Sequence, residues 1–522
     1  LYRSENQNGE QEMMNEVKYE AIPASEFEFV GEGDRLHDKK LETKPVGYFR
    51  DAMSRFAKNK SSVVAAFIIL FLVLYAVLTP LLCENSYTLA LTDTTYLNYT
   101  KLPPRVKGLG WLGMDGCADR TVNTETYNLL RAIGAETGLD PVLEVYRADY
   151  KDPTASSNST FYDIKTDKYY EMGMMYMTLT PAQYEDIQAW QDQTGLQVIY
   201  PAITDSKQSD ANVWYKTNKK GAPALDAEGN FQPIYRQTTP TDTSYHSIRI
   251  AADTDPEHPM AYARVTGTSD ARSYVTRICK YTYFQYRYGF EPSFVFGTNA
   301  KGQDIFTRLA AGARFSLIFA ICISAINLFI GAIYGAIEGY YGGWIDLTME
   351  RICDVLSGVP FMVVTTLFQL HLSKRVGVIP SLLFAFVLTG WIGMAGRVRM
   401  QFYRFKGQEY VLAARTLGAS DGRIMFKHIF PNSLGTIITG SVLVIPGVIF
   451  SESSLTYLGI VNLESSTMTS VGTMLANGKN YLATDPYIIL LPSLFISLLE
   501  ISFNLFGNGL RDAFNPSLRG AE

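Results

Sequence analysis

Six apolar stretches without Asp, Glu, Lys or Arg limit what this chain can fold into more than any other feature. They are residues 61–83, 315–337, 355–373, 376–396, 428–451 and 486–499. A helix that crosses the hydrocarbon core of a membrane needs roughly 20 mostly apolar residues. Five stretches are long enough, and the sixth continues past Glu500 to Leu510 as an apolar helix that carries one acid. The sequence therefore predicts six transmembrane helices.

Basic residues indicate which side of the membrane the helix ends face. Lys and Arg gather before the first stretch, between the fourth and fifth, and after the sixth: Arg50, Arg55, Lys58, Lys60; Arg397, Arg399, Arg404, Lys406, Arg415, Arg423, Lys427; and Arg511, Arg519. With six spans all of them fall on the side of the N-terminus, which the positive-inside rule makes cytoplasmic. Lys374 and Arg375 are the exception. We therefore expect cytoplasmic termini and an extracytoplasmic segment, 84–296, between the first two helices.

The segment 84–296 has the composition of a folded domain. It holds 21 of the 33 Tyr, and about 210 residues can bury a sizeable core. Residues 121–138 and 180–195 have the pattern of amphipathic helices that end at Gly. Aromatic and β-branched residues, which are typical of strands, are concentrated in residues 196–200, 246–251, 260–266 and 273–288. The sequence predicts an α+β insertion here.

The remaining boundaries follow from the same patterns. Residues 1–45 are acidic and polar and contain no apolar run, so we expect a cytoplasmic tail rather than a signal peptide. Residues 46–83 are expected to form an amphipathic lead-in and the first transmembrane helix. Residues 297–510 are expected to form a core with helices two to six, and residues 511–522 a cytoplasmic C-terminal tail.

A polar insert interrupts the apolar core at residues 409–433, EYVLAARTLGASDGRIMFKHIFPNS. One helical face is formed by Tyr410, Ala413, Ala414 and Leu417, and its paired alanines leave room for another surface to come close. Gly418 is expected to end this helix, and Ser420 or Asp421 to cap a second one.

In the second helix of the insert, Ile424, Met425 and His428 share a face, and Pro431 is expected to stop the helix before the fifth span. The result is a two-helix elbow at the cytoplasmic surface. Composition alone also fits an interfacial helix that contacts anionic headgroups through Arg415, Arg423 and Lys427.

The elbow resembles the cytoplasmic coupling loop in the membrane subunits of bacterial ABC importers. The resemblance lies in two alanines, a glycine four residues later and a proline thirteen residues after that. In that family the loop docks into a cleft on the ATPase subunit. The resemblance implies a coupling loop over residues 398–431, with this role for Glu409, Ala413, Ala414, Gly418, Asp421, Arg423, Phe430 and Pro431. Leu412 stands where the family usually has Glu, and Phe430 where it usually has Leu.

Three further segments resemble the oligopeptide and dipeptide permeases, specifically their C-type membrane subunit. They are FGTNAKGQDIFTRLAAGARFSL (296–317), GYYGGWIDLTMERICDVLSGVPF (339–361) and FNLFGNGLRDAFNPSLR (503–519). In the first, Asn299, Gln303 and Thr307 differ from the family's usual residues. The resemblance covers roughly residues 45–82 and 296–520, so it explains neither the first 45 residues nor the outer segment.

The resemblance implies a membrane all-α fold, the type I ABC importer fold with six transmembrane helices, carrying the α+β insertion between helices 1 and 2. It implies a non-catalytic permease subunit in the bacterial cell membrane that forms half of a pathway for oligopeptides or dipeptides. The implied partners are a second permease subunit, two cytoplasmic ATPase subunits, an extracellular solute-binding protein and membrane lipid. ATP and Mg would be bound by the ATPase subunits, and no cofactor by this chain.

Two intramembrane acids and two cysteines are further candidates. A carboxylate at mid-helix costs about 2.5–3.5 kcal/mol on insertion scales, so it usually faces a cavity or a partner. Glu452 and Glu500 could therefore line the translocation path. The alternatives are an outer-surface position for Glu452 and a helix–helix hydrogen bond for Glu500. Cys117 and Cys279 could form a disulfide if their segment is extracytoplasmic.

Other functions have less support in the sequence. The net charge of −5 favours no nucleic-acid partner. The sequence contains no Walker A loop, H-E-x-x-H or G-x-S-x-G motif, and its five cysteines match no metal-binding spacing. The alternatives are an importer of the same class for nickel or another small solute, a secondary transporter, and a membrane-anchored receptor or enzyme.

Overall fold

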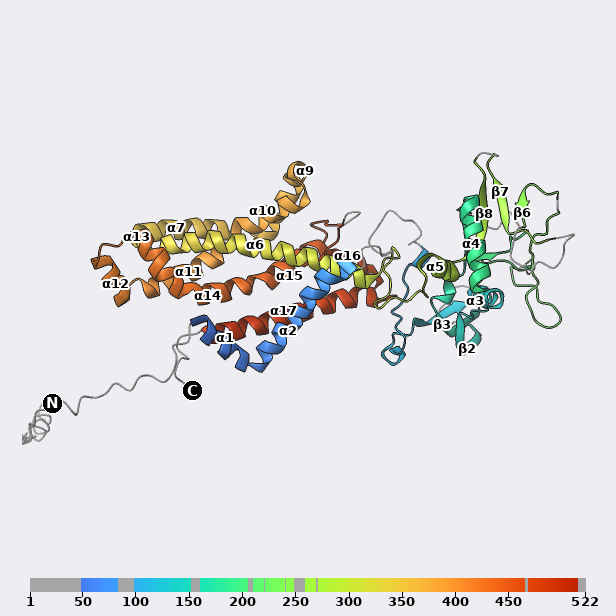
Figure 1. Ribbon diagram of the computed structural model, residues 1–522, viewed down its shortest axis with the longest axis horizontal. Coiled ribbons are helices and arrows are strands. Elements are labelled where there is room, and N and C mark those ends of the chain that lie inside the picture. The colour runs from blue at the N-terminus through green and yellow to red at the C-terminus, as the bar shows by residue number, and fades with distance from the viewer. Residues whose placement is uncertain are drawn as a thin grey trace, which may run out of the picture. The chain divides into compact units, whose positions relative to one another are not determined.

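A computed structural model of the chain describes residues 48–82, 98–151, 160–204, 210–219, 221–239, 241–247, 259–268, 271–464 and 468–514 (Figure 1). The tail expected at residues 1–45 and most of the expected C-terminal tail lie outside the described residues.

Helices form the part of the chain that the apolar stretches predict to lie in the membrane. They are α1 (Tyr48–Lys58), α2 (Lys60–Leu82), α6 (Ile305–Tyr341), α7 (Gly343–Ser357), α8 (Phe361–His371), α9 (Ser373–Val376), α10 (Val378–Gly390), α11 (Ile392–Phe405), α12 (Glu409–Thr416), α13 (Asp421–Arg423), α14 (Phe430–Val442), α15 (Val444–Tyr457), α16 (Val471–Gly478) and α17 (Tyr487–Phe514). A π-helical turn, Ile424–Ile429, joins α13 to α14. We call this set of helices the bundle.

Five helices in the described part of the chain are long and apolar enough to cross a membrane: Lys60–Leu82, Ile305–Tyr341, Val378–Phe405, Asp421–Tyr457 and Tyr487–Phe514. The predicted span 355–373 instead falls on α7 and α8, which pass the same test as a pair but are bent by 70°. Pro360 precedes α8 with extended backbone angles (φ −60°, ψ 128°), because proline cannot continue the helix that ends before it. The prediction of six spans therefore holds if the bent pair counts as one.

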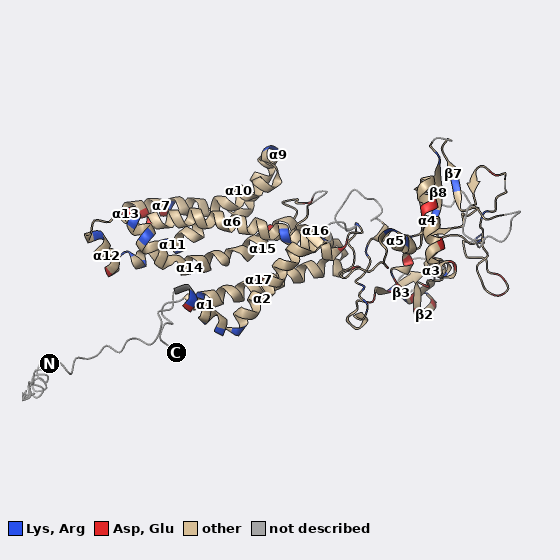
Figure 2. Cartoon of the chain, viewed as in Figure 1, with Lys and Arg blue, Asp and Glu red and all other residues tan. Residues whose placement is uncertain are grey.

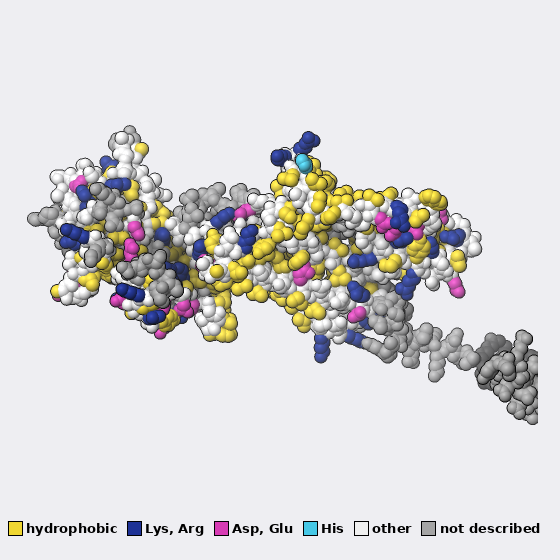
Figure 3. All heavy atoms as spheres, turned by 180° about the vertical axis from the view of Figure 1, so that it is seen from behind, with side chains coloured by type: hydrophobic (Ala, Val, Ile, Leu, Met, Phe, Trp, Pro, Cys, Tyr) yellow, Lys and Arg dark blue, Asp and Glu magenta, His cyan; other side chains and the backbone are white. Residues whose placement is uncertain are grey.

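Charge is distributed as a membrane-spanning bundle requires. Figure 2 shows the long helices almost free of charged residues over their middle stretches, with Lys and Arg gathered around α1, α11 and α12. Figure 3 shows hydrophobic side chains over the visible face of the bundle, and Phe67, Phe71 and Leu78 of α2 are among the exposed ones. Contact with lipid tails accounts for this exposure, because a bilayer does not favour polar surface.

Helices α6 and α11 approach each other closely through glycines spaced four residues apart. A Cβ atom built on Gly335 would lie 2.1 Å from the Ala395 carbonyl oxygen, and one on Gly339 would lie 2.7 Å from the Arg399 carbonyl oxygen. Backbone approaches this close need residues without side chains at the contact. This seam fixes the position of α11, which leads into the elbow.

The part of the sequence between α2 and α6 forms two antiparallel sheets. The first has the order β1 (Cys117–Asn123), β3 (Thr160–Asp167), β2 (Val142–Lys151). The second has the order β4 (Met174–Leu179), β8 (Ser273–Cys279), β7 (Ala263–Thr266), β6 (Tyr245–His246), and β5 (Ile199–Tyr200) also pairs with β8. Every described strand pairing is antiparallel.

Each sheet has an amphipathic helix whose caps are readable in the sequence. α3 (Thr124–Thr137) packs Leu130 and Ile133 against Ile164 of β3. α4 (Pro181–Thr194) begins with a capping box in which Thr180 and Gln183 exchange hydrogen bonds. Both helices end at a glycine in the left-handed region. The two helix predictions, 121–138 and 180–195, therefore agree with the structure, except that residues 121–123 end β1.

The strand predictions are less accurate. Segments 196–200 and 260–266 contain β5 and β7, and 246–251 overlaps β6 only at its start, the rest lying mostly outside the described residues. Segment 273–288 is a strand only as far as Cys279, because α5 (Lys280–Tyr288) follows directly. The aromatic residues of α5 caused the error: Tyr281 and Phe284 are buried at helical spacing.

The disulfide considered between Cys117 and Cys279 is absent. Cys117 lies on β1 and Cys279 on β8, in different sheets, and both are free thiols. Cys279 is buried in the aromatic core beside Tyr281 and Phe284, where a thiol behaves as a small apolar side chain.

Candidate functional site

The predicted elbow lies beside the C-terminal end of α6. α12 stops just before Gly418, whose φ of +81° is in the left-handed region that favours glycine. The Gly418 N–H donates to the Arg415 carbonyl oxygen at 3.0 Å, and the Ala419 N–H to that of Ala414 at 3.1 Å. The chain therefore turns sharply after α12, and α13 begins at Asp421.

One side of the elbow is fixed to the bundle by apolar packing. Val411, Ile424 and Ile429 are fully buried. They belong to one cluster with Tyr340 of α6 and Phe402 of α11. The elbow is therefore a packed part of the bundle and not a loose loop.

Polar contacts tie the same side to the last turn of α6. The Tyr340 hydroxyl donates to Asp421 Oδ1 at 2.6 Å. The Arg415 guanidinium donates to the Tyr340 oxygen at 3.3 Å. Tyr340 therefore links α12 and α13 to the last turn of α6.

The other side of the elbow exposes apolar residues. Tyr410, Ala413 and Leu417, which we call the outer face of α12, are exposed, and Leu417 is exposed to 88%. Leu412 and Phe426 are also about half exposed, at 47% and 53%. Ala414 was expected on the same face but is turned inward, with 9% exposure.

The remaining predicted coupling residues lie around this face. Glu409 opens α12 and is exposed, Arg423 ends α13 and is exposed, and Phe430 is half-buried. Ser420 occupies the N-cap position, but its side chain makes no capping hydrogen bond. The Asp421 carboxylate accepts from Tyr340 instead of capping the helix.

The prediction that Pro431 stops the second helix is wrong. Residues 421–457 form one continuous span, and Pro431 lies in the first turn of α14. The π-helical turn before it pairs the Phe430 N–H with the Met425 carbonyl oxygen. The wider π-helical turn before it accommodates the proline ring, which in a regular α-helix would clash with the carbonyl group four residues earlier. The elbow is thereby continuous with the fifth predicted span.

Glu452 lies inside the bundle. It is fully buried, and its carboxylate accepts from the Ser316 hydroxyl at 3.0 Å and the Thr456 hydroxyl at 3.3 Å. The outer-surface alternative for Glu452 is therefore wrong. The Glu452 carboxylate therefore has hydrogen-bond donors from two helices, α6 and α15.

Glu500 differs from Glu452. It lies mid-way along α17, is half-buried, and its Oε1 atom is buried without a hydrogen-bond partner among the described residues. The helix–helix hydrogen bond considered for this side chain is thus not observed for Oε1.

An ion-pair network that the sequence pattern does not predict lies near the elbow. Arg399 of α11 pairs with Glu338 at 3.6 Å, with Asp346 at 2.7 Å, and with Glu350. The three carboxylates lie within 4.8 Å of one another, a spacing that could hold a metal ion. The Arg399 guanidinium already supplies a cation to all three, so the network fastens α6, α7 and α11 together.

A cavity of about 330 Å³, which the sequence pattern does not predict either, lies at the N-terminal end of α6, the opposite end from Tyr340. Helix α6 has 37 residues, so the two sites are roughly 55 Å apart along it. The cavity is lined by Asn299, Ala300, Lys301, Ile305, Arg308, Glu464, Thr469, Met474, Ala476, Asn477, Asn480, Tyr481 and Ile488.

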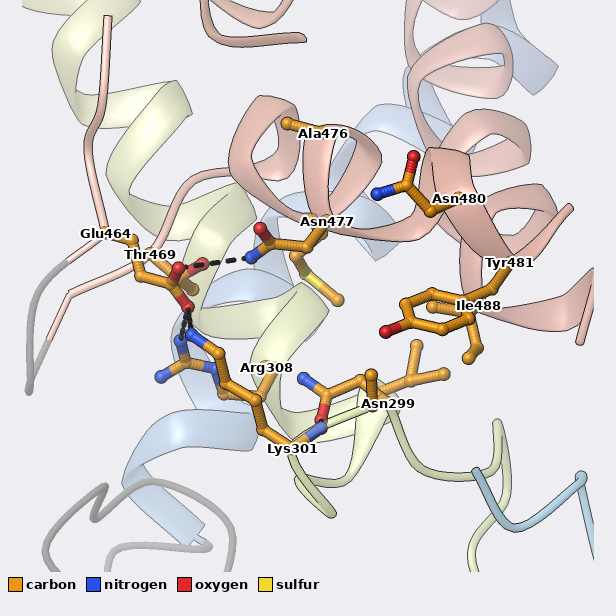
Figure 4. Close-up of a pocket in the computed structure, with 13 residues that line it drawn as sticks. Asn299, Lys301, Arg308, Glu464, Thr469, Ala476, Asn477, Asn480, Tyr481 and Ile488 are labelled. Carbon is orange, nitrogen blue, oxygen red and sulfur yellow. Dashed lines mark hydrogen bonds and ion pairs between the residues drawn. The ribbon is translucent and has the colours of Figure 1, made fainter. Parts of the chain in front are cut away.

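Glu464 organises the polar side of this cavity. Its carboxylate accepts from Lys301 Nζ at 2.8 Å and from Asn477 Nδ2 at 3.2 Å, and lies 4.0 Å from Arg308 Nη2 (Figure 4). Burial raises the pKa of the Glu464 carboxyl, but the hydrogen bonds from Lys301 and Asn477 outweigh it and lower the pKa below its ordinary value. The carboxylate is therefore charged at neutral pH.

Two family models match the chain. Residues 327–520 match the binding-protein-dependent transport system inner membrane component, and residues 47–104 match the N-terminal TM domain of oligopeptide transport permease C. The oligopeptide transport system permease protein OppC of Bacillus subtilis is 42% identical over 224 residues, which cover 43% of this chain and 72% of that protein. The chain belongs to this family of transport permeases.

Two other relatives agree. The permease is 41% identical to the dipeptide transport system permease protein DppC of Bacillus subtilis, over 43% of the chain and 69% of that protein. It is 33% identical to OppC of Escherichia coli strain K12, over 44% of the chain and 74% of that protein. The permease is thus a multi-pass subunit of an ABC importer in the bacterial cell membrane. Neither family model covers residues 105–326, which contain both sheets.

Solved structures resemble the permease only distantly. An inward-facing form of the MetNI methionine ABC transporter has a TM-score of 0.34 and 14% identity, over 40% of the permease and 96% of that chain. An amino acid ABC transporter with histidines is 16% identical, with a TM-score of 0.30, over 38% of the permease and 92% of that chain.

The hydrogen bonds of Glu452 lead to a prediction about its two polar partners. Glu452→Leu would leave the Ser316 hydroxyl buried without its acceptor, whereas the Thr456 hydroxyl would keep the backbone carbonyl oxygen of residue 452 at 3.0 Å. We expect this variant to destabilise the permease by about 1–3 kcal/mol. Glu452→Gln keeps a carbonyl acceptor and should melt close to the wild type. The measurement is the melting temperature of the detergent-solubilised permease by size-exclusion chromatography. Equal loss in both variants would show that the negative charge itself is needed.

Proposed function

We propose that the permease carries oligopeptides or dipeptides across the membrane as one half of a translocation pathway. A second permease subunit would form the other half. Two ATPase subunits would bind ATP and Mg and drive the cycle, and a solute-binding protein would deliver the peptide. Similarity to the oligopeptide permease OppC and the dipeptide permease DppC supports a peptide as the substrate.

The observation that carries the proposal is the two-sided elbow. Its inner side is packed on α6 and α11 through Val411 and Ile424. Its outer side exposes the outer face of α12, including Leu417. An element that is rigidly joined to two long helices and apolar on its free side is suited to receive a partner and pass on its movement. We assign the ATPase subunits to this face.

Orientation is part of the same proposal. The elbow and the Arg399 network would be cytoplasmic, and the two-sheet insertion would face outside, as the distribution of Lys and Arg favours. The insertion would then dock or guide the binding protein. Removing it should abolish delivery of peptide by the binding protein, and uptake that survives the deletion would contradict this role.

The coupling role of the elbow predicts that Gly418→Pro abolishes uptake. Proline fixes φ near −65° and has no N–H, whereas Gly418 has φ +81° and donates to Arg415. The turn after α12 cannot form, so the outer face of α12 would be displaced. We expect uptake of a labelled tetrapeptide to fall at least tenfold, to the level of cells that lack the permease.

The control for this experiment is Gly422→Ala. Gly422 lies in the same elbow, has no positive φ, and a Cβ atom there would meet nothing within 4 Å. Uptake should be unchanged, and both variants should be present in the membrane at wild-type levels. Normal uptake in cells without the permease, where no other peptide importer operates, would remove the peptide assignment. The same strains would then be tested with nickel and other small solutes.

A further inference from the structure

The cavity at the N-terminal end of α6 contains an excess of positive charge. Lys301 and Arg308 face one carboxylate, that of Glu464 (Figure 4). The Glu464 carboxylate is satisfied by Lys301 and Asn477. One positive charge is therefore left without an equally close anion among the described residues that line the cavity.

That charge belongs to Arg308. Its side chain is only 3% exposed, yet its guanidinium makes no hydrogen bond with any described residue. The Glu464 oxygen is 4.0 Å from Arg308 Nη2, which is beyond hydrogen-bond distance. A guanidinium has five N–H donors, and no Arg308 nitrogen is among the fully enclosed unpaired atoms, so these donors reach the space of the cavity. The described residues supply them with no acceptor.

The lining and volume of the cavity indicate which chemical group could accept hydrogen bonds from Arg308. A guanidinium pairs best with a planar group that offers two oxygens, as a carboxylate does. The amide side chains of Asn299 and Asn480 line the same space, and Met474 and Ile488 give it apolar walls. The volume of about 330 Å³ is at the small end of ligand pockets, which span roughly 300–1,000 Å³.

We propose that this cavity binds the C-terminal carboxylate of a transported peptide, with Arg308 as its bidentate partner and Lys301 as a second cation at the rim. The inference rests on the proposed function, since it takes a peptide as the substrate. The Asn480 amide lines the cavity and is placed to bind the last peptide group. The Asn299 amide instead shapes the wall, because its Oδ1 accepts from the Lys301 and Gln303 N–H groups and its Nδ2 donates to Gln303. The cavity thus recognises a feature that all unmodified peptides share, whatever their side chains.

The test compares two forms of one labelled tetrapeptide, the free acid and the C-terminal amide. Equilibrium binding is measured on the assembled importer in lipid discs, without the binding protein, so that only the membrane part selects. The wild type should bind the acid at least tenfold more tightly than the amide. Arg308→Lys keeps the positive charge but loses the two parallel N–H donors of the guanidinium. It should weaken binding of the acid about tenfold and leave the affinity for the amide unchanged.

A second variant and a control make the test independent of whether Arg308→Lys folds normally. Lys301→Gln changes a half-exposed side chain and should weaken binding of the acid several-fold. Lys479→Gln removes an exposed cation on the 3₁₀ turn after α16, outside the cavity lining, and should change neither form. Equal binding of acid and amide to the wild type would overturn the inference. So would an absence of binding, or equal losses for both forms in the variants.

Failure of this inference can be told apart from failure of the proposed function. If uptake of the tetrapeptide depends on the permease but the discs do not discriminate acid from amide, only the carboxylate site is wrong. If uptake does not depend on the permease, the peptide assignment itself is wrong.

Discussion

Gly335→Ala is expected to separate α6 from α11 and to destabilise the permease by about 1–3 kcal/mol or more, as overpacking of a tight contact does. The added Cβ would lie 2.1 Å from the Ala395 carbonyl oxygen and 2.9 Å from its carbon. Both are backbone atoms, so no side-chain rotation can relieve the clash. The helices must move apart, and Gly335→Leu should be worse than Gly335→Ala.

The consequences of Gly335→Ala should reach the elbow. The α6–α11 seam also positions Arg399 beside Glu338, and Phe402 in the cluster under α12. We expect a lower melting temperature of the solubilised permease and, at temperatures where it stays folded, reduced peptide uptake. The measurement pairs size-exclusion melting with uptake per assembled complex.

Gly393→Ala and Gly396→Ala are the matched controls. Both glycines lie on α11, and a Cβ atom at either position would meet nothing within 4 Å. Alanine has a helix propensity about 1 kcal/mol more favourable than glycine, so these variants should melt at or above the wild-type temperature. If Gly335→Ala melted at the same temperature as these two controls, the close contact between α6 and α11 would be contradicted.

The helices of the bundle could be predicted because their cause is local. A charge-free apolar stretch of about 20 residues has few alternatives to a membrane-spanning helix. The bend between α7 and α8 was harder to predict, because Pro360 indicates that the helix breaks but not the angle of the bend. The strands of the insertion were predicted poorly because short strands depend on distant partners: β5 has two residues, and both pair with β8.

The elbow was predicted in outline and corrected in detail. Gly418 ends α12 as the sequence suggested, because its need for a positive φ is local. Pro431 was misread, since the π-helical turn that accommodates it has no clear sequence pattern. Ala414 was placed on the free face by helical spacing, but packing turns it inward. Periodicity identifies a face and does not say what covers it.

The cavity and the Arg399 network could not be predicted from one sequence. Lys301 and Arg308 are separated from Glu464 by more than 150 positions along the chain. Arg399 joins residues of α6 and α7 that lie 49–61 positions before it. Such groupings arise only after the helices pack, and single charged residues near helix ends are common without any such role.

Arg277→Met is expected to destabilise the two-sheet insertion by about 3–5 kcal/mol, the usual cost of removing one partner of a buried ion pair. Arg277 is fully buried on β8 and its guanidinium donates to both oxygens of Glu136 on α3, at 2.6 and 2.5 Å. It also donates to the carbonyl oxygens of Ala211 and Pro201. The substitution leaves the Glu136 carboxylate, whose side chain is 4% exposed, without its cation.

Hydrogen exchange of the intact permease measures this effect locally. Amides of α3 and β8 should exchange at least about a hundredfold faster in Arg277→Met, since 1.4 kcal/mol corresponds to a factor of ten. Lys107→Met is the control: Lys107 pairs with Glu291 at 3.2 Å but is 89% exposed, and a surface pair contributes at most about 1 kcal/mol.

The double variant Arg277→Met with Glu136→Leu separates the charge from the packing. If the loss in Arg277→Met comes from an uncompensated buried carboxylate, removing that carboxylate should restore most of the protection, because apolar replacements of a buried pair are often neutral. The Tyr235 hydroxyl, which donates to Glu136 at 2.8 Å, would lose its acceptor and should account for a residual loss of about 1–3 kcal/mol. The double variant could instead lose as much stability as the two single variants lose together. That result would mean that Arg277 acts through its contacts to Ala211 and Pro201, and that the ion pair itself adds little.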